Sequence, residues 1–307
     1  MSEASHHIAD AGADNWVERI LPQGALPYAQ LMRLDRPIGW WLLLLPCWWG
    51  LLLAHVSEGT FPNLWFAFLF FAGAVVMRGA GCTLNDIIDR KIDALVARTK
   101  LRPIPSGRVS VKQAIVFLAV QGLLGLAILL QFDGFTIALG ASSLLIVAVY
   151  PFMKRITHWP QLVLGLAFNW GALVGWSAVH GALSWPPIAL YVGGIFWTLA
   201  YDTIYAHQDR EDDALIGVKS TALRFGGQTR LWLAGFFAAS LIAIDTALWL
   251  AGTSFISHIG VALAAIHGCW QVSRFELNSP VRALALFKSN RLFGLAVSVF
   301  LLVDCFA

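Results

Sequence analysis

A run of nine residues, NDIIDRKID at 85–93, carries the most chemically suggestive spacing in this sequence. Asn85, Asp89 and Asp93 follow one another at intervals of four, so on a continuous helix they share one face. Carboxylates at this spacing repel one another by a few tenths of a kcal/mol. At a membrane boundary they also lose hydration, and a bound cation would compensate for both effects.

A second acidic run, YDTIYAHQDREDD, occupies residues 201–213. Tyr201, Tyr205, Asp209 and Asp213 repeat the interval of four, and Asp202 precedes Asp209 by seven residues. The number of residues from Asp89 to Asp209 is the same as the number from Asp93 to Asp213. The two runs therefore read as related sites on two parts of one architecture.

Oxygen-only ligands of this kind suit Mg²⁺, which keeps several waters and bridges to substrate phosphates. Neither run contains a cluster of histidines or thiolates, which argues against zinc. We therefore predict two Mg²⁺ sites that face one diphosphate. The predicted metal ligands are Asn85, Asp86, Asp89, Asp93, Asp209 and Asp213, and the catalytic residues among them are Asp89, Asp93, Asp209 and Asp213. The alternative is that both runs are solvated helix ends, which two matched runs make the weaker interpretation.

Basic loops follow both runs: residues 98–108 after the first and 217–221 after the second. Such loops can close over a phosphate, or they can bind anionic lipid head groups. The sequence of the loops alone favours neither use.

The composition excludes a soluble protein. Of the 307 residues, 58% are hydrophobic and 13% are charged, whereas a soluble domain carries about 25% charged residues. The net charge is only +3. Four separated cysteines in apolar stretches predict buried thiols rather than a metal site.

Apolar runs predict nine transmembrane helices, because each run is long enough to cross a bilayer and a helix satisfies its own backbone polar groups. The runs lie at roughly 38–56, 62–82, 112–131, 135–152, 161–180, 186–206, 231–250, 255–273 and 290–307. We expect an all-α membrane protein with two four-helix halves and a ninth helix around a central cavity. Residues 1–24 are expected to form a cytosolic tail, and residues 25–307 one transmembrane domain.

Among the connections between the predicted spans, Lys and Arg occur only in alternate ones, which by the positive-inside rule lie in the cytoplasm. The prediction is a multi-pass protein of the bacterial inner (cytoplasmic) membrane with a cytoplasmic N-terminus.

Both acidic runs resemble the aspartate-rich motifs of the UbiA-type intramembrane prenyltransferases, NDIIDRKID matching the family's NDxxDxxxD pattern. Four further stretches resemble the branch that acts on 4-hydroxybenzoate: RLDRPIGWWLLLLPCWWG at 33–50, RPIPSG at 102–107, YPFMKRITHWPQ at 150–161 and GVKST at 217–221. The resemblance covers nearly the whole chain.

The resemblance implies transfer of a polyprenyl group from its diphosphate to the ring carbon ortho to the hydroxyl of 4-hydroxybenzoate, in ubiquinone biosynthesis, with Mg²⁺ as cofactor. It also implies roles for Arg36 and Lys154 on the diphosphate, and for Arg78 on either the diphosphate or the benzoate carboxylate. Tyr201 and Tyr205 are candidates for stabilising an allylic cation. The full predicted set of substrate-binding residues is Arg36, Arg78, Lys154, Arg155, Tyr201, Asp202, Tyr205, Arg102 and Lys219.

Two alternatives remain at this point: a prenyltransferase with another aromatic acceptor, and a cation-coupled transporter. A transporter is expected to carry acidic groups near mid-membrane on broken helices, whereas both runs here lie at the ends of predicted spans. The predicted partners are the two substrates and membrane lipid, with no nucleic acid. The prenyl chain length and the oligomeric state stay open.

Overall fold

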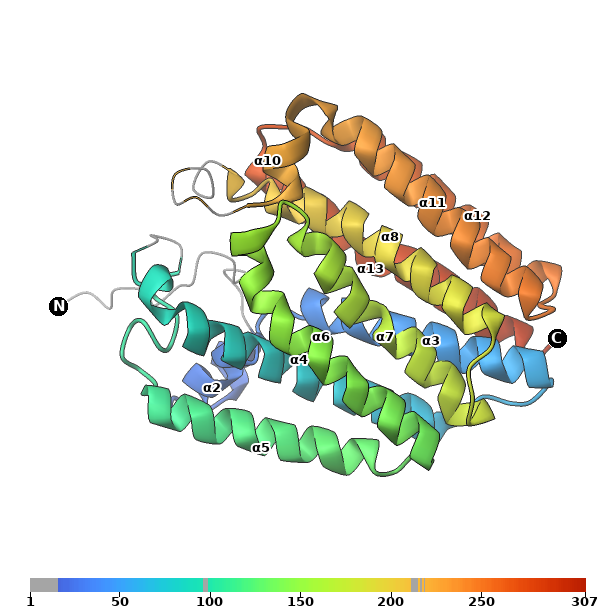
Figure 1. The fold of residues 1–307 in the computed structure, drawn as a ribbon, viewed down its shortest axis with the longest axis horizontal. Coiled ribbons are helices and arrows are strands. Elements are labelled where there is room, and N and C mark those ends of the chain that lie inside the picture. Colours follow the sequence, from blue (N-terminus) through green and yellow to red (C-terminus); the bar gives the residue numbers. More distant parts are fainter. Residues whose placement is uncertain (1–15, 96–98, 211–214, 216, 218) are drawn as a thin grey trace. The chain divides into compact units, whose positions relative to one another are not determined.

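The computed structural model describes residues 16–95, 99–210, 215, 217 and 219–307, and in this part of the chain every regular element is a helix (Figure 1). The long helices are α3 (Ile38–Glu58), α4 (Leu64–Asp93), α5 (Val111–Leu129), α6 (Gly134–Ile156), α7 (Pro160–His180), α8 (Trp185–Ala206), α11 (Thr229–Leu250), α12 (Phe255–Arg274) and α13 (Pro280–Asp304). The short ones are α1 (Trp16–Ile20), α2 (Leu26–Leu31), α10 (Thr221–Phe225) and a 3₁₀ turn, Gly226–Gln228.

Eight helical segments among the described residues are long and apolar enough to cross a membrane. They are the long helices other than α8, with α10 and the 3₁₀ turn counted as one segment with α11. Helix α8 has 22 residues but falls outside this set, and it contains Pro186, Pro187 and Asp202. The all-helical membrane class is therefore confirmed, while the count of nine spans stays a prediction.

Two helices extend well beyond the apolar runs that predicted them. Helix α4 continues through the whole first acidic run to Asp93, and α13 begins at Pro280, ten residues before the predicted start. Ser279 starts α13, since its hydroxyl accepts a hydrogen bond from the Arg282 N–H. Polar residues thus prolong both helices past their apolar parts.

The chain divides into two compact units. The first consists of Met1–Trp41 and Phe71–Gln131, and the second of Leu42–Phe70 and Phe132–Ala307. This division does not follow the two predicted four-helix halves, because most of the chain after Gln131 packs in one unit. Most of the predicted tail, residues 1–15, lies outside the described residues, and the single-domain assignment stays a prediction.

In the second unit, glycines let α3 and α7 approach closely. A Cβ added at Gly50 would lie 2.1 Å from the carbonyl oxygen of Ala172, and one at Gly175 would lie 2.2 Å from that of Cys47. Small residues at such crossings bring backbones together, and the resulting packing holds membrane helices. Helix α8 packs against α7, α11 and α13, and α12 packs against α11 and α13.

Some helix starts in the second unit are fixed by side-chain caps. The carboxylate of Asp133 accepts hydrogen bonds from the N–H groups of Phe135 and Thr136 at the start of α6. Ser254 caps α12 and is itself held by Asp304, the last residue of α13. Such caps satisfy N–H groups that have no partner within the helix.

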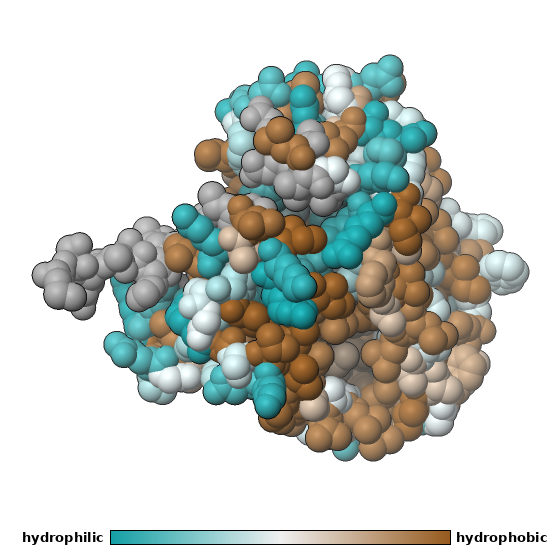
Figure 2. Space-filling model, turned by 60° about the vertical axis from the view of Figure 1, so that its left-hand side comes forward, coloured by the Kyte–Doolittle hydropathy of each residue, from teal (hydrophilic) through white to brown (hydrophobic). Residues whose placement is uncertain are grey.

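The outward-facing side chains agree with a lipid environment. Figure 2 shows hydrophobic side chains over a large part of one face of the molecule. Only 11% of the most apolar window of α5 is buried, and the same holds for α6, whereas 72% of that window is buried in α3. Extended exposed apolar surface is unfavourable in water, so these helices are suited to a bilayer.

Candidate functional site

The first acidic run lies on the uninterrupted helix α4, as its spacing predicted. Asn85 is half-buried, and Asp89 and Asp93 are buried. Because helical residues four apart lie one above the other, these three oxygen-bearing side chains belong to one face of α4. Their donor set suits a hard divalent cation.

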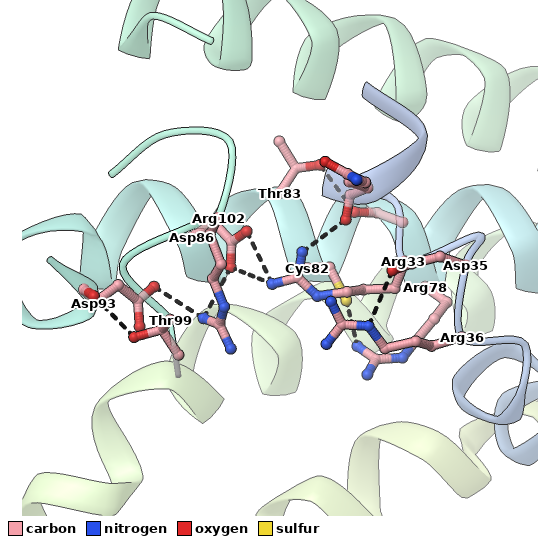
Figure 3. A network of polar contacts seen from close by, with 12 residues as sticks. Arg33, Asp35, Arg36, Arg78, Cys82, Thr83, Asp86, Asp93, Thr99 and Arg102 are labelled. Carbon is pink, nitrogen blue, oxygen red and sulfur yellow. Dashed lines mark hydrogen bonds and ion pairs between the residues drawn. The ribbon is translucent and has the colours of Figure 1, made fainter. Parts of the chain in front are cut away.

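Asp86 does not belong to that face, since consecutive helical residues point about 100° apart. It is fully buried, and it lies between two guanidinium groups (Figure 3). Arg33 Nη2 donates to both carboxylate oxygens, at 2.7 and 2.9 Å, and Arg102 Nη1 lies 3.3 Å from Oδ1. This differs from the predicted metal-ligand role of Asp86, because its carboxylate already neutralises two cations.

Arg102 joins Asp86 to Asp93. The same Nη1 donates to Asp93 Oδ2 at 2.9 Å, and the Thr99 hydroxyl donates to the Asp93 carbonyl oxygen at 2.8 Å. The basic loop after the first run is therefore fastened to the end of α4. In this arrangement Arg102, a predicted substrate-binding residue, serves as the counter-ion of two carboxylates.

Arg33 has an unusual backbone conformation, with φ of 58°. Its guanidinium also donates to the Gln30 carbonyl oxygen at 2.7 Å. Although burial opposes the charge, the adjacent carboxylate of Asp86 raises the pKa of Arg33 above its ordinary value. The side chain is thus a permanent cation in a buried ion pair.

Arg36 and Arg78 lie near the start of α3 in the same unit. Arg36 Nε donates to Asp35 Oδ2 at 3.1 Å, and Arg78 Nη1 contacts the Cys82 sulfur at 2.8 Å (Figure 3). A Cβ at Gly39 would lie 2.6 Å from Arg78 Nε. The guanidinium of Arg78 therefore passes over a helical turn that only glycine leaves open.

The second acidic run does not continue as one helix. Helix α8 ends at Ala206, and Asp209 follows in a non-helical bend. The predicted stripe through Tyr201, Tyr205, Asp209 and Asp213 therefore holds only for the two tyrosines, and Asp213 lies outside the described residues. The helix ends because His207, at its C-cap, leaves the helical hydrogen-bond ladder.

Among the predicted site residues of the second run, Asp202, Tyr205 and Asp209 are half-buried. Tyr201 is only 1% exposed and packs in the core, with its ring centroid 5.1 Å from that of Trp197. The Thr198 hydroxyl donates to the Tyr201 oxygen at 3.1 Å. Tyr205 is therefore better placed than Tyr201 to meet a substrate.

His207, which follows α8, is buried. Burial, aided by the charge of Arg210, lowers the pKa of His207 to about 4. Its Nε2 pairs with the Thr229 hydroxyl at 3.2 Å. His207, which is not among the predicted site residues, is thus a neutral imidazole with a structural partner.

The predicted basic residues of the second unit meet at the end of α6. Lys154 and Arg155 lie in its last turn, and the backbone N–H of Lys219 donates to the Lys154 carbonyl oxygen at 2.9 Å. Lys219 Nζ donates to the Ile156 carbonyl oxygen at 3.1 Å. Lys219 thus stabilises the C-terminus of a helix, where cations are favoured.

No group of three or more His, Cys, Asp or Glu side chains arranged for a metal ion occurs within the described ranges. The carboxylates at the end of α4 are shared with guanidinium groups, and the second run is only partly described. Asn85 and Asp89 remain chemically suited to Mg²⁺, because both offer oxygen and lie on one face.

Comparison with known proteins decides the family. The model of the UbiA prenyltransferase family matches residues 43–296, most of the chain. The chain belongs to the UbiA prenyltransferase family. Both acidic runs lie within the matched range.

Two curated relatives of this UbiA family member carry the same name, "4-hydroxybenzoate polyprenyltransferase, mitochondrial". The one from Aedes aegypti is 50% identical over 88% of this chain and 61% of its own length. The one from Arabidopsis thaliana is 50% identical over 91% of this chain and 69% of its own length. The chain thus spans 61% and 69% of the length of these two relatives.

A solved structure supports the same fold. The chain resembles a UbiA homolog from Archaeoglobus fulgidus bound to GPP and Mg²⁺, with a TM-score of 0.67 and 25% identity. The match covers 89% of this chain and 99% of the homolog.

The predicted bacterial inner membrane is wrong, because the curated relatives of this UbiA family member are named as mitochondrial proteins. The placement of Lys and Arg predicts the side of a membrane on which a loop lies. It carries no information about the organelle to which that membrane belongs.

Sequence reasoning missed the partners that hold the first site. In the sequence, Arg33 stands in a motif of the UbiA branch with no predicted role of its own, and no pattern singles out Gln30 or Thr99. The available signal was the pair of arginines in RLDR at 33–36 beside an acidic run with more carboxylates than one metal face can use.

Proposed function

We propose that this protein transfers a polyprenyl group from polyprenyl diphosphate to the ring carbon ortho to the hydroxyl of 4-hydroxybenzoate, in ubiquinone biosynthesis. The observation that carries the proposal is 50% identity over about nine tenths of the chain to relatives that bear this name. The acidic face of α4 and the embedding of the chain in a membrane agree with it. We also propose a mitochondrial membrane as its location.

In the reaction, the bond between the allylic carbon and the diphosphate oxygen breaks, and that carbon bonds to the ring of 4-hydroxybenzoate. The ring then loses the proton from the substituted carbon. Asn85, Asp89 and Asp93 of α4 would hold one Mg²⁺, and Asp209 and Asp213 of the second run would hold another. Bound there, the two ions would neutralise charge on the departing diphosphate.

The side chains of the chain itself have three tasks. Arg36 and Lys154 would bind diphosphate oxygens through charge-assisted hydrogen bonds. Tyr205 would offer the face of its ring to the developing allylic cation. Apolar residues of the membrane helices would exclude water, which would otherwise capture that cation.

Arg78 would hold the carboxylate of 4-hydroxybenzoate. It lies two helical turns before Asn85 on the same face of α4, since seven residues make two turns. Its guanidinium, next to the first turn of α3 at Gly39, adds to the positive end of that helix. We further propose nine membrane spans, with α8 as the sixth, because α8 is as long as its neighbours.

The test is an assay of detergent-purified protein with polyprenyl diphosphates and several aromatic acids, with and without Mg²⁺. We expect a prenylated 4-hydroxybenzoate that depends on Mg²⁺ and is absent in Asp89→Ala. Turnover of a different aromatic acid but not of 4-hydroxybenzoate would refute the acceptor. Full activity in chelator would refute the metal.

Saturation curves then separate the cationic residues. Lys154→Ala should slow turnover about 10- to 100-fold with every acceptor, because a charge-assisted contact contributes about 1.5–3 kcal/mol. Arg78→Ala should raise the apparent KM for 4-hydroxybenzoate and leave that for the prenyl donor nearly unchanged. A raised KM for the prenyl donor instead would assign Arg78 to the diphosphate.

A further inference from the structure

The starting observation is the left-handed backbone of Arg33, the one non-glycine residue with positive φ in the described part of the chain. For a residue with a long side chain this conformation is unfavourable, because Cβ comes close to the following carbonyl oxygen. Such strain persists only where the surroundings determine it, and it tends to occur at functional sites. The contacts of Arg33 must therefore outweigh the cost.

Those contacts come chiefly from Asp86. Two hydrogen bonds to its carboxylate, 2.7 and 2.9 Å long, and one to the Gln30 carbonyl oxygen hold the guanidinium of Arg33. Asp86 is completely buried, and an unpaired buried carboxylate would be very unfavourable. Each member of the pair thus requires the other.

The strained residue controls the path of the chain into α3. The Leu34 N–H donates to the Ala29 carbonyl oxygen, and the Arg36 N–H donates to the Arg33 carbonyl oxygen, both at 3.0 Å. These bonds form a tight turn between α2 and α3. Arg36 ends that turn, so its position depends on the conformation of Arg33.

We propose that Asp86 is a positioning residue for anion binding and not a metal ligand. Through Arg33 it fixes the turn that presents Arg36 to the phosphate oxygens of a diphosphate. The role of Arg36 on the diphosphate rests on the proposed function, whereas the link from Asp86 to Arg36 rests on the contacts above.

The affinities of the detergent-purified protein for Mn²⁺ and for inorganic diphosphate test this assignment, and neither measurement needs the aromatic acceptor. Mn²⁺ binding is followed by electron paramagnetic resonance, and binding of inorganic diphosphate by calorimetry at a fixed Mn²⁺ concentration. Asp86→Asn should weaken diphosphate binding about 10- to 100-fold and change Mn²⁺ affinity less than about twofold. Asp89→Asn, the matched control on the same helix, should weaken Mn²⁺ binding at least tenfold.

Arg33→Ala should reproduce the effect of Asp86→Asn on diphosphate, and the double variant should be no worse than either single variant. If Asp86→Asn does not fold, Arg33→Lys serves instead: it keeps the charge but loses the two-pronged contact, and should weaken diphosphate binding with Mn²⁺ binding intact.

Equal loss of Mn²⁺ binding in Asp86→Asn and Asp89→Asn would overturn the assignment, as would unchanged diphosphate affinity in Asp86→Asn or Arg33→Lys. These outcomes do not depend on the aromatic acid. A wild-type protein that prenylates another acceptor would refute the proposed function and leave this inference standing.

Discussion

A buried amide between α12 and α13 should contribute strongly to the stability of the second unit. Asn290 is fully buried. Its Oδ1 accepts hydrogen bonds from Trp197 Nε1 at 3.0 Å and from Gln271 Nε2 at 3.1 Å, and its Nδ2 donates to Gln271 Oε1 at 2.9 Å. Three hydrogen bonds between helices therefore converge on one side chain. Asn290→Leu keeps the branched shape of the side chain and removes all three.

The expected loss follows from this count. Side-chain hydrogen bonds between membrane helices contribute about 0.6 kcal/mol each on average, with a maximum near 1.7. Three such bonds give about 2 kcal/mol for Asn290→Leu. Gln271→Leu removes two of them and spares the bond from Trp197, so its loss should be about 1 kcal/mol. In the double variant the loss should fall short of the sum by about 1 kcal/mol, because the two residues share two bonds.

The assay is unfolding of the purified protein in mixed micelles of dodecylmaltoside and SDS, followed by circular dichroism. Ser298→Ala on α13 is the matched control: its hydroxyl donates only to the Gly294 carbonyl oxygen of its own helix, so its loss should stay below about 0.5 kcal/mol. A loss in Asn290→Leu no larger than in Ser298→Ala would refute the reasoning. Strict additivity in the double variant would refute the shared network.

Three further predictions concern stability, each measured by the same unfolding assay. Asp304→Ala should lower the free energy of unfolding by about 2–4 kcal/mol, since the carboxylate accepts hydrogen bonds from the Ser254 N–H and the Ser257 hydroxyl and charged bonds are the strong ones. Gly50→Ala should lower the free energy of unfolding by about 3 kcal/mol or more, because the added Cβ would overlap a backbone carbonyl of α7. Although burial opposes it, hydrogen bonds at the start of α6 lower the pKa of Asp133. The resulting stabilisation is present above the ordinary pKa of about 4 and is lost as pH falls through the lowered value, and Asp133→Ala should remove this dependence.

Matched control variants show whether a loss of stability comes from the assigned contacts or from a general sensitivity of the helix to substitution. Val303→Ala, next to Asp304 and exposed, should change stability little. Gly122→Ala on α5, where a Cβ meets nothing within 4 Å, should be neutral or slightly stabilising. Equal losses in control and test variants would contradict the contacts assigned here, and an unchanged pH dependence in Asp133→Ala would contradict the role of its carboxylate.

Hydropathy alone predicted most helix positions to within a few residues, because lipid demands about 20 apolar residues for each span. It failed where helices leave the apolar region. Helix α4 continues to Asp93 and α13 starts at Pro280, since polar residues can continue a helix beyond the apolar run that hydropathy detects. Hydropathy placed the end of α8 correctly, whereas the four-residue spacing of Tyr201, Tyr205 and Asp209 predicted a helix beyond Ala206, where α8 ends.

The site was predictable as a set of residue types and not as a set of pairs. The spacing of Asn85 and Asp89 predicted a shared face, because that relation is local. Arg33, the partner that holds both carboxylate oxygens of Asp86, lies 53 residues away in the sequence, and no local pattern indicates that folding brings this arginine to it. The charge balance among Arg33, Asp86, Arg102 and Asp93 arises only when the chain folds.

The contrast in burial between α3 and α5 sets different rules for sequence change. In α3 most positions of the apolar window are enclosed, so replacements must preserve side-chain volume as well as polarity. In α5 and α6 only 11% of such positions are buried, so apolar side chains of different sizes are accepted more readily. Orthologous sequences should therefore interchange Leu, Ile, Val and Phe freely along α5, and saturation mutagenesis should reject size changes mainly along α3.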